Sequence, residues 1–219
     1  MTPTVERFRR LARSSPWRWD AIAFTLDWPV TAPVQATVER PDRLRVVDHH
    51  GLVVTDGAFE PTGRGGTRPD PDLDDDGLAT AVRRVDCERD SVPMWTSYLW
   101  SALLDPAELA DGVDGDPAVD VVSLQGVTHH GREAWEAVVR PRPSYAPLCA
   151  CCALLPCARA DVLEGQPLST YADAHLVRLD VATAVCVLSR EVGGPRHGRG
   201  HDLRLTQVRP GPARRRLAR

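Results

Sequence analysis

The protein has 219 residues, of which 42% are hydrophobic and 26% are charged, and its formal net charge is −3. This length is enough for a full hydrophobic core, and the near-neutral charge gives no electrostatic reason to expect nucleic acid as a partner. The sequence contains no lysine, so all 27 basic residues are arginine. This excludes Schiff-base chemistry on lysine, phosphate-loop lysines and kinase-type ATP-binding lysines.

The N-terminal stretch MTPTVERFRRLARSSPWRW contains charges throughout and lacks the apolar run of a signal peptide. No segment approaches the roughly 20 apolar residues of a membrane span. We therefore expect a cytoplasmic protein without a transmembrane segment, whose six cysteines are mostly reduced.

The first half of the chain predicts one helix followed by short strands. Residues 4–13 have apolar positions at helical spacing. Alternating apolar and polar residues then predict strands at 23–28, 34–39, 44–48 and 52–55. Pro41-Asp42 and His50-Gly51 indicate turns, and Asp56-Gly57 indicates a further hairpin.

The middle of the chain combines an acidic loop with a second helix. Residues 60–92 are rich in Pro, Gly and Asp, which is typical of an exposed loop. Asp72 to Gly77 matches the start of a calcium loop, but the final ligand position holds Arg83, which favours a solvated loop. After Ser91, an apolar stripe predicts a helix that ends at Asp105-Pro106, with members Trp95, Tyr98, Leu99, Ala102 and Leu103.

The second half predicts two hairpins and a final strand. Residues 119–128 and 132–140 flank the turn His129-His130-Gly131, and residues 175–181 and 185–190 flank a second turn. A last strand follows around 203–207. Consecutive hairpins with a helix between two β halves indicate an α+β fold, in which a curved antiparallel sheet packs against one or two helices.

Four segments of the chain resemble the lipoprotein-carrier, or lipoprotein-sorting, superfamily. In order they are PDRLRV, LLDPAEL, VSLQGVTHHGREAWEAVV and AHLVRLDVATAVCVLSRE, and the resemblance covers roughly residues 20–208. It implies an open half-barrel with helices as a lid and an apolar ligand in the concave face. We expect a single half-barrel domain over residues 1–208, with a cysteine-rich insertion at 144–165 and a basic, disordered tail at 209–219.

The insertion contains four cysteines within nine residues, at Cys149, Cys151, Cys152 and Cys157. Thiolates at short spacing can bind zinc or another soft metal, with Cys87 or His175 as further ligands. A disulfide or redox pair and buried free thiols are the alternatives. The sequence leaves these three interpretations open.

Histidine pairs and aromatic residues are the remaining candidates. His49-His50 and His129-His130 both fall at turns, and they would form a proton-transfer or metal site if the turns met at one rim of the sheet. The aromatic candidates for lining the groove are Trp28, Trp95, Tyr98, Trp100 and Trp135. Of these, Trp100 lies off the helix stripe and is the best candidate for an exposed contact.

We therefore interpret the protein as a binding module that holds a small apolar or amphipathic ligand, or a peptide, in the half-barrel groove. The cysteine cluster would then serve as a structural staple or a metal site. One alternative is an enzyme of natural-product or peptide modification, with His and Cys acid–base chemistry in the groove. Another is an interaction protein with a protein partner.

Overall fold

The computed structural model describes residues 2–29, 31–58, 72–82, 94–147, 149, 152–165 and 167–213. The strands of the described chain are β1 (Trp19–Trp28), β2 (Thr31–Glu39), β3 (Arg43–Val47), β4 (Val53–Ala58), β5 (Val119–His129), β6 (Arg132–Pro141), β7 (Ala174–Asp180), β8 (Cys186–Val192) and β9 (Asp202–Pro210). The helical segments are α1 (Val5–Arg18), α3 (Leu99–Leu104), η1 (Ala107–Leu109), η2 (Val113–Gly115) and α4 (Ala158–Glu164).

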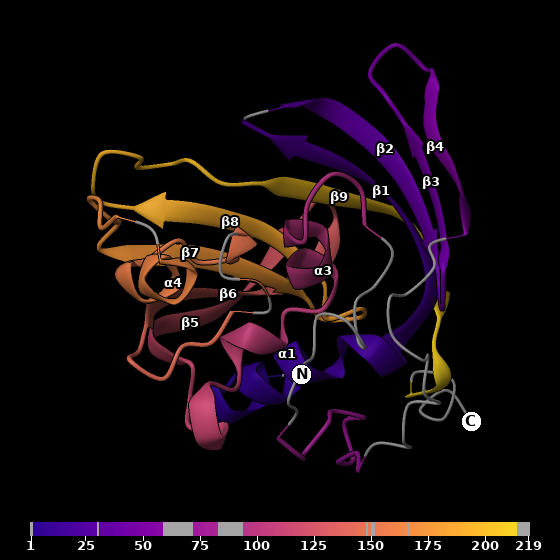
Figure 1. Ribbon diagram of the computed structural model, residues 1–219. Helices are drawn as coiled ribbons and strands as arrows, with labels where there is room; N and C mark the ends of the chain where they lie inside the picture. Colours follow the sequence, from indigo (N-terminus) through magenta and orange to yellow (C-terminus); the bar gives the residue numbers. More distant parts are fainter. Residues whose placement is uncertain are drawn as a thin grey trace.

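All nine described strands form one antiparallel sheet in the order β4-β3-β2-β1-β9-β8-β7-β6-β5. The sheet curves around α1 and α3, as Figure 1 shows. This confirms the predicted α+β class and the curved antiparallel sheet packed against helices. The last strand, β9, lies beside the first strand, β1, so the C-terminal strand joins the two β halves.

A hydrogen bond between two strands that are four positions apart shows that the sheet is strongly curved. Strands β5 and β9 are four strand spacings apart, about 19 Å across a flat sheet. Yet His129 Nε2, at the end of β5, lies 3.2 Å from the carbonyl oxygen of Leu203 in β9. The sheet therefore coils enough to bring the β5–β6 turn against the beginning of β9.

Helix α1 continues five residues beyond the predicted end at residue 13, to Arg18. The apolar pattern in the sequence ends before the helix does, because the last turn of the helix buries polar residues instead of apolar ones. The buried Arg18 guanidinium donates to the carbonyl oxygens of Gly77, Val181 and Ala182 at 2.7–3.1 Å. A hydrophobic pattern does not detect a segment that is held in this way.

The acidic loop packs against α1 where residues 72–82 are described. Asp74 Oδ2 accepts a hydrogen bond from Arg10 at 3.0 Å, and Asp76 pairs with Arg7 at 2.7 Å. Leu78 is fully buried. This part of the loop is therefore anchored by arginines of α1, which differs from the expected solvated loop. Arg83 lies outside the described residues.

Two local predictions are wrong. Asp56 and Gly57 form no hairpin: they lie inside β4, opposite Arg45 and Leu44, because the chain has already turned at residues 48–51. The second helix is also shorter than its apolar stripe, since α3 begins only at Leu99. Ser91, after which the helix was expected to begin, lies outside the described residues.

Candidate functional site

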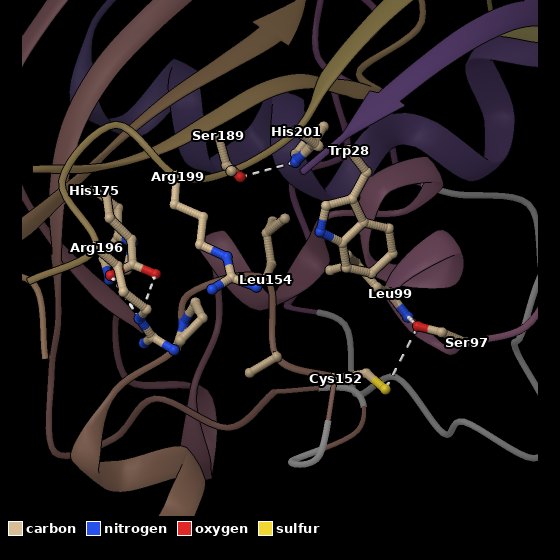
Figure 2. Close-up of a pocket in the computed structure, with 14 residues that line it drawn as sticks. Trp28, Ser97, Leu99, Cys152, Leu154, His175, Ser189, Arg196, Arg199 and His201 are labelled. Atoms are coloured by element: carbon tan, nitrogen blue, oxygen red, sulfur yellow. Dashed lines mark hydrogen bonds and ion pairs between the residues drawn. The ribbon is translucent and has the colours of Figure 1, made fainter. Parts of the chain in front are cut away.

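A pocket of about 230 Å³ opens where the second β half meets α3 and the described part of the cysteine-rich insertion (Figure 2). One wall is apolar and consists of Trp28, Leu99, Ala153, Leu154 and Pro156. The opposite wall is polar and consists of His175, Ser189, Glu191, Arg196, Arg199 and His201. The pocket therefore presents an apolar surface and a charged surface to the same small volume.

The apolar wall is held in place by a buried hydrogen-bond network. Glu108 of η1 is 5% exposed, and its Oε1 accepts hydrogen bonds from the Tyr145 hydroxyl at 2.5 Å and from the backbone N–H of Leu154 at 2.8 Å. The Tyr145 oxygen accepts in turn from Leu155 N–H at 3.1 Å. Burial is the main cause that raises the pKa of Tyr145 well above its usual value. This network fixes the segment that carries Leu154 and Pro156.

The polar wall comes from β7, β8 and the loop between β8 and β9. Backbone hydrogen bonds place Arg199 opposite Glu191, at 2.8 Å, and His201 opposite Ser189, at 3.2 Å. Gly200 lies between Arg199 and His201, and a Cβ at this position would overlap the backbone oxygen of Ser189. Glycine therefore allows the loop to lie directly against β8, which turns the neighbouring side chains into the pocket.

Two cations lie at this wall in different environments. Arg196 Nε pairs with Glu191, a carboxylate that is 6% exposed, at 3.1 Å. Arg199 is exposed, and no carboxylate of the described residues pairs with it. Figure 2 shows its guanidinium extending across the pocket toward Leu154. Arg199 is therefore the cation that a ligand can meet.

His175 is 2% exposed, and no atom of the described chain forms a hydrogen bond with its Nε2. The pKa of His175 is lowered to about 4, mainly by burial; a hydrogen bond with the Pro156 backbone opposes the shift, and the nearby Arg196 cation adds to it. The ring is thus neutral at pH 7. Its Nε2 faces the pocket without a hydrogen-bond partner in the described chain. A buried polar atom without a partner lowers the stability of the fold.

Ser189 and His201 are hydrogen-bonded at the same wall. Ser189 Oγ lies 2.8 Å from His201 Nδ1, and His201 Nε2 lies 3.0 Å from the carbonyl oxygen of Cys186. Burial is the main cause that lowers the pKa of His201 to about 4. Because a carbonyl only accepts, the neutral ring carries its proton on Nε2, and the serine hydroxyl donates to Nδ1.

Of the five aromatic residues predicted to line a groove, Trp28 alone lines this pocket. Trp135 is fully buried. Trp95 and Tyr98 are half-buried. Trp100 is 2% exposed and packs 5.5 Å from the Phe24 ring and 6.1 Å from the Trp95 ring. The expectation of an exposed Trp100 is therefore wrong: it packs against the sheet, because α3 is also buried off its apolar stripe, where Ser101 and Leu104 are buried too.

The structure describes three of the four cysteines of the predicted cluster. Cys149, Cys152 and Cys157 are half-buried, and Cys151 and Cys87 lie outside the described residues. The Cys152 thiol lines the pocket and accepts a hydrogen bond from Ser97 Oγ at 3.6 Å. Burial is the main cause that raises the pKa of Cys157. Zinc binding by the cluster stays a prediction.

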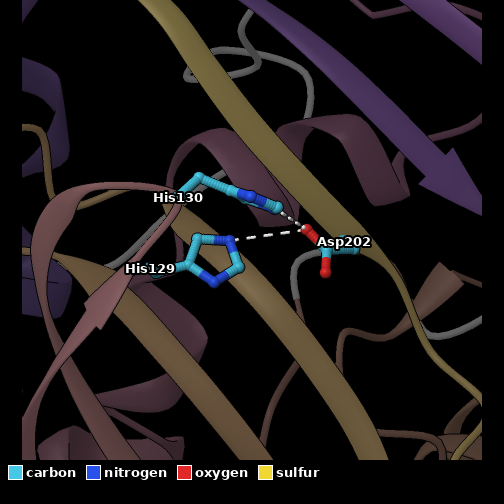
Figure 3. A group of neighbouring side chains, drawn as sticks. All are labelled: His129, His130 and Asp202. Carbon is cyan, nitrogen blue, oxygen red and sulfur yellow. Dashed lines mark hydrogen bonds and ion pairs between the residues drawn. The ribbon is translucent and has the colours of Figure 1, made fainter.

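The two histidine pairs do not meet. His49-His50 turns from β3 to β4 and His129-His130 from β5 to β6, at opposite ends of the strand order. The His49 and His50 rings contact each other, with centroids 3.8 Å apart and ring planes tilted by 42°. His129 and His130 instead lie with Asp202, and this is the only such group of three metal-binding side chains in the described part of the chain (Figure 3).

Sequence reasoning missed Ser189, Arg196, Arg199 and His201. The signal for Arg196, Arg199 and His201 was the stretch GGPRHGRGH at 193–201, a glycine-rich connection with alternating basic residues, whereas Ser189 lies before it in β8. Gly193, Gly194 and Gly198 adopt positive φ there, which identifies a shaped loop.

Comparison with known proteins places the chain in no established family: no family model and no curated protein matches it. Among solved structures, it is similar to one described as the crystal structure of MucB in complex with MucA(peri). The sequence identity is 15% and the TM-score is 0.38, and the alignment covers 97% of this chain and 57% of that chain. This chain thus spans little more than half the length of MucB in that structure. In the described chain, no helix has the length and apolar character needed to cross a membrane.

Proposed function

We propose that the protein is a binding module for a small amphipathic acid, whose apolar part packs on Trp28 and Leu99 and whose acidic group pairs with Arg199. The observation that carries this proposal is the position of an apolar wall beside a cation with no carboxylate partner in the described chain. A pocket of about 230 Å³ suits a small ligand or the end of a longer chain.

The charge of the pocket favours an anion. Its described walls include the carboxylate of Glu191 and the guanidiniums of Arg196 and Arg199. His175 and His201 are neutral at pH 7, because the pKa of each is about 4. Since Glu191 pairs with Arg196, the charge of Arg199 remains in excess.

Isothermal titration calorimetry with sodium octanoate, octanol and octylamine tests this proposal. Octanoate should bind at least tenfold more tightly than octanol, because a hydrogen bond to a charged group contributes about 1.5–3 kcal/mol. Octylamine should bind weakest. Arg199→Gln should remove the preference for octanoate, whereas the control Arg204→Gln, at an exposed position of β9, should keep it. Equal affinities for the three probes, or no binding at millimolar concentration, would refute the proposal.

The Ser189–His201 hydrogen bond supports a second candidate function, that of an acyl hydrolase. A serine hydroxyl that donates to a histidine, which is itself oriented by a carbonyl, has the arrangement of nucleophile, base and orienting group. Here a fluorophosphonate probe should label wild-type protein and leave Ser189→Ala unlabelled. If the probe modifies neither protein, and ester hydrolysis is the same in both, this candidate is excluded.

A further inference from the structure

A second group of side chains lies at the coiled end of the sheet, on residues that do not line the pocket. His129 and His130 come from the β5–β6 turn, and Asp202 begins β9 (Figure 3). His130 Nε2 lies 2.7 Å from Asp202 Oδ1, and His129 Nε2 lies 3.5 Å from the same oxygen. One ligand atom from each residue falls within 4.8 Å of the other two.

The separation of 3.5 Å between His129 Nε2 and Asp202 Oδ1 matches two ligands of one metal ion, and the 2.7 Å between His130 Nε2 and Asp202 Oδ1 is slightly shorter than such a spacing. Ligand atoms bound about 2.1 Å from one ion lie roughly 3–3.5 Å from one another in tetrahedral or octahedral geometry. Two imidazoles and one carboxylate on one side of an ion form the set that divalent transition metals prefer, whereas Mg²⁺ and Ca²⁺ prefer oxygen ligands. We propose that His129, His130 and Asp202 form a binding site for a divalent transition metal such as Zn²⁺ or Co²⁺.

The burial of the three residues supports an open site. The side chain of His129 is 6% exposed, whereas those of His130 and Asp202 are 37% and 28% exposed. An ion can therefore enter from solvent and bind an inner, fixed ligand and two outer ligands. Three protein ligands leave at least one coordination position for water or a substrate, as in catalytic zinc sites.

Two arginines lie next to the cluster and oppose a cation. Arg178 Nη1 is 3.2 Å from His129 Nδ1, and Arg190 Nη2 is 3.8 Å from Asp202 Oδ2. Glu136 partly compensates, because it pairs with Arg178 at 2.7 Å. The two arginines thus balance the charges of Glu136 and Asp202, and no net negative charge remains to attract a cation, which limits the affinity of the site.

The hydrogen bond from Arg178 also fixes the tautomer of His129. A guanidinium only donates, so His129 Nδ1 accepts, and Nε2 carries the proton that it donates to Leu203 O. Metal ligation needs the Nε2 lone pair. The proton must therefore leave or move to Nδ1, and a move to Nδ1 requires Arg178 Nη1 to withdraw. Arg178 is the residue that competes with the metal.

The test uses Co²⁺ and the metal-free full-length protein, with absorption spectroscopy and calorimetry. Wild-type protein should bind one Co²⁺ without a thiolate-to-cobalt charge-transfer band, which separates this site from the cysteines. Both His130→Ala and Asp202→Asn should weaken binding at least 10–100-fold, the loss that follows removal of even an outer-sphere partner. The double variant His49→Ala/His50→Ala, which removes the matching pair of the other turn, should bind like wild type.

Arg178→Gln provides a second readout. Glutamine can still donate to Glu136, and its carbonyl can accept the proton that His129 must carry on Nδ1, so this variant should bind Co²⁺ roughly tenfold more tightly. Circular dichroism checks that each variant is folded. No binding by wild type, a thiolate band for the bound Co²⁺, or equal affinity of wild type and folded His130→Ala would overturn the proposal. None of these outcomes bears on octanoate binding at Arg199.

Discussion

Strands β1–β4 and strands β5–β9 each include a hairpin that turns through His-His-Gly, at residues 49–51 and 129–131. In the first half His49 and His50 are exposed, and Asp48 accepts hydrogen bonds from two N–H groups of its own turn. In the second half His129 is 5% exposed, and a carboxylate 72 residues away reaches His130.

The difference lies in what the coiled sheet brings to each turn, since the turns share the same three residues. The β3–β4 hairpin is at the end of the strand order, and its outer strand β4 is largely exposed. The β5–β6 turn meets β9, so its histidines acquire Leu203 and Asp202 as partners, and β7 adds Arg178. An identical local motif therefore becomes a candidate site only where tertiary structure adds a distant strand.

The largest expected difference between the halves concerns their arginine–aspartate pairs. Asp180, whose side chain is 2% exposed, accepts from Arg132 at 2.7 and 3.1 Å and from Thr183. Asp180→Ala should lower the free energy of unfolding by about 3–5 kcal/mol, because a partly buried guanidinium and the turn lose their acceptor.

Urea denaturation followed by circular dichroism measures this effect. The control is Asp56→Ala, since Arg45 and Asp56 pair at 2.6 Å with side chains that are 51% and 43% exposed. Its loss should stay below about 1 kcal/mol, as for other exposed ion pairs. Equal losses in the two variants would show that burial does not distinguish the halves.

The second effect is a dependence of stability on pH that arises in the second half. The pKa of His175 falls from 6.5 to about 4 on folding, mainly through burial. Between these values the unfolded chain binds more protons than the folded chain, so stability decreases as the pH falls from 6.5 towards 4. Two charged groups lie near His175. Glu191 is its neighbour in the β7–β8 register, and Arg196 acts on it through its charge.

Lowering the pH from 7 to 5 should therefore remove about 2 kcal/mol of stability through His175 alone. Denaturant midpoints at the two pH values measure the loss, and His175→Gln should show a correspondingly flatter dependence. The double variant His49→Ala/His50→Ala should keep the wild-type slope, because both rings are exposed. A wild-type slope in His175→Gln would contradict the assignment to this residue.

The smallest expected loss of stability is that of replacing the turn glycines, and it should be equal in the two halves. Gly51 and Gly131 have φ values of +82° and +80°, and an added Cβ would meet no atom within 4 Å at either position. Gly51→Ala and Gly131→Ala should each cost about 1–2 kcal/mol, because only the left-handed backbone is strained. Thermal denaturation compares the two, and a clear inequality would mean that the turns already differ in their local backbone.

Local patterns in the sequence predicted much of the fold. The 119–140 and 175–190 hairpins lie close to their predicted positions, because alternation and turn residues act over a few neighbours. Predictions were wrong where a distant contact decided the outcome. Polar anchoring extends α1 to Arg18, and packing against Phe24 buries Trp100. Most of the candidate pocket was missed: of the five aromatic residues predicted to line a groove, Trp28 alone lies at this pocket.

The sequence by itself determined the strand-rich α+β class and the two histidine turns, because these depend on side chains within a few positions of one another. Only the tertiary structure decided that Trp28, Leu99 and Arg199 line one pocket, and that Asp202 lies beside His129 and His130. The physical reason is that β9 pairs with β1, and that the curved sheet brings the end of β5 against β9, although the two strands are four positions apart in the sheet. Neither the position of β9 nor the coiling of the sheet is encoded within one segment.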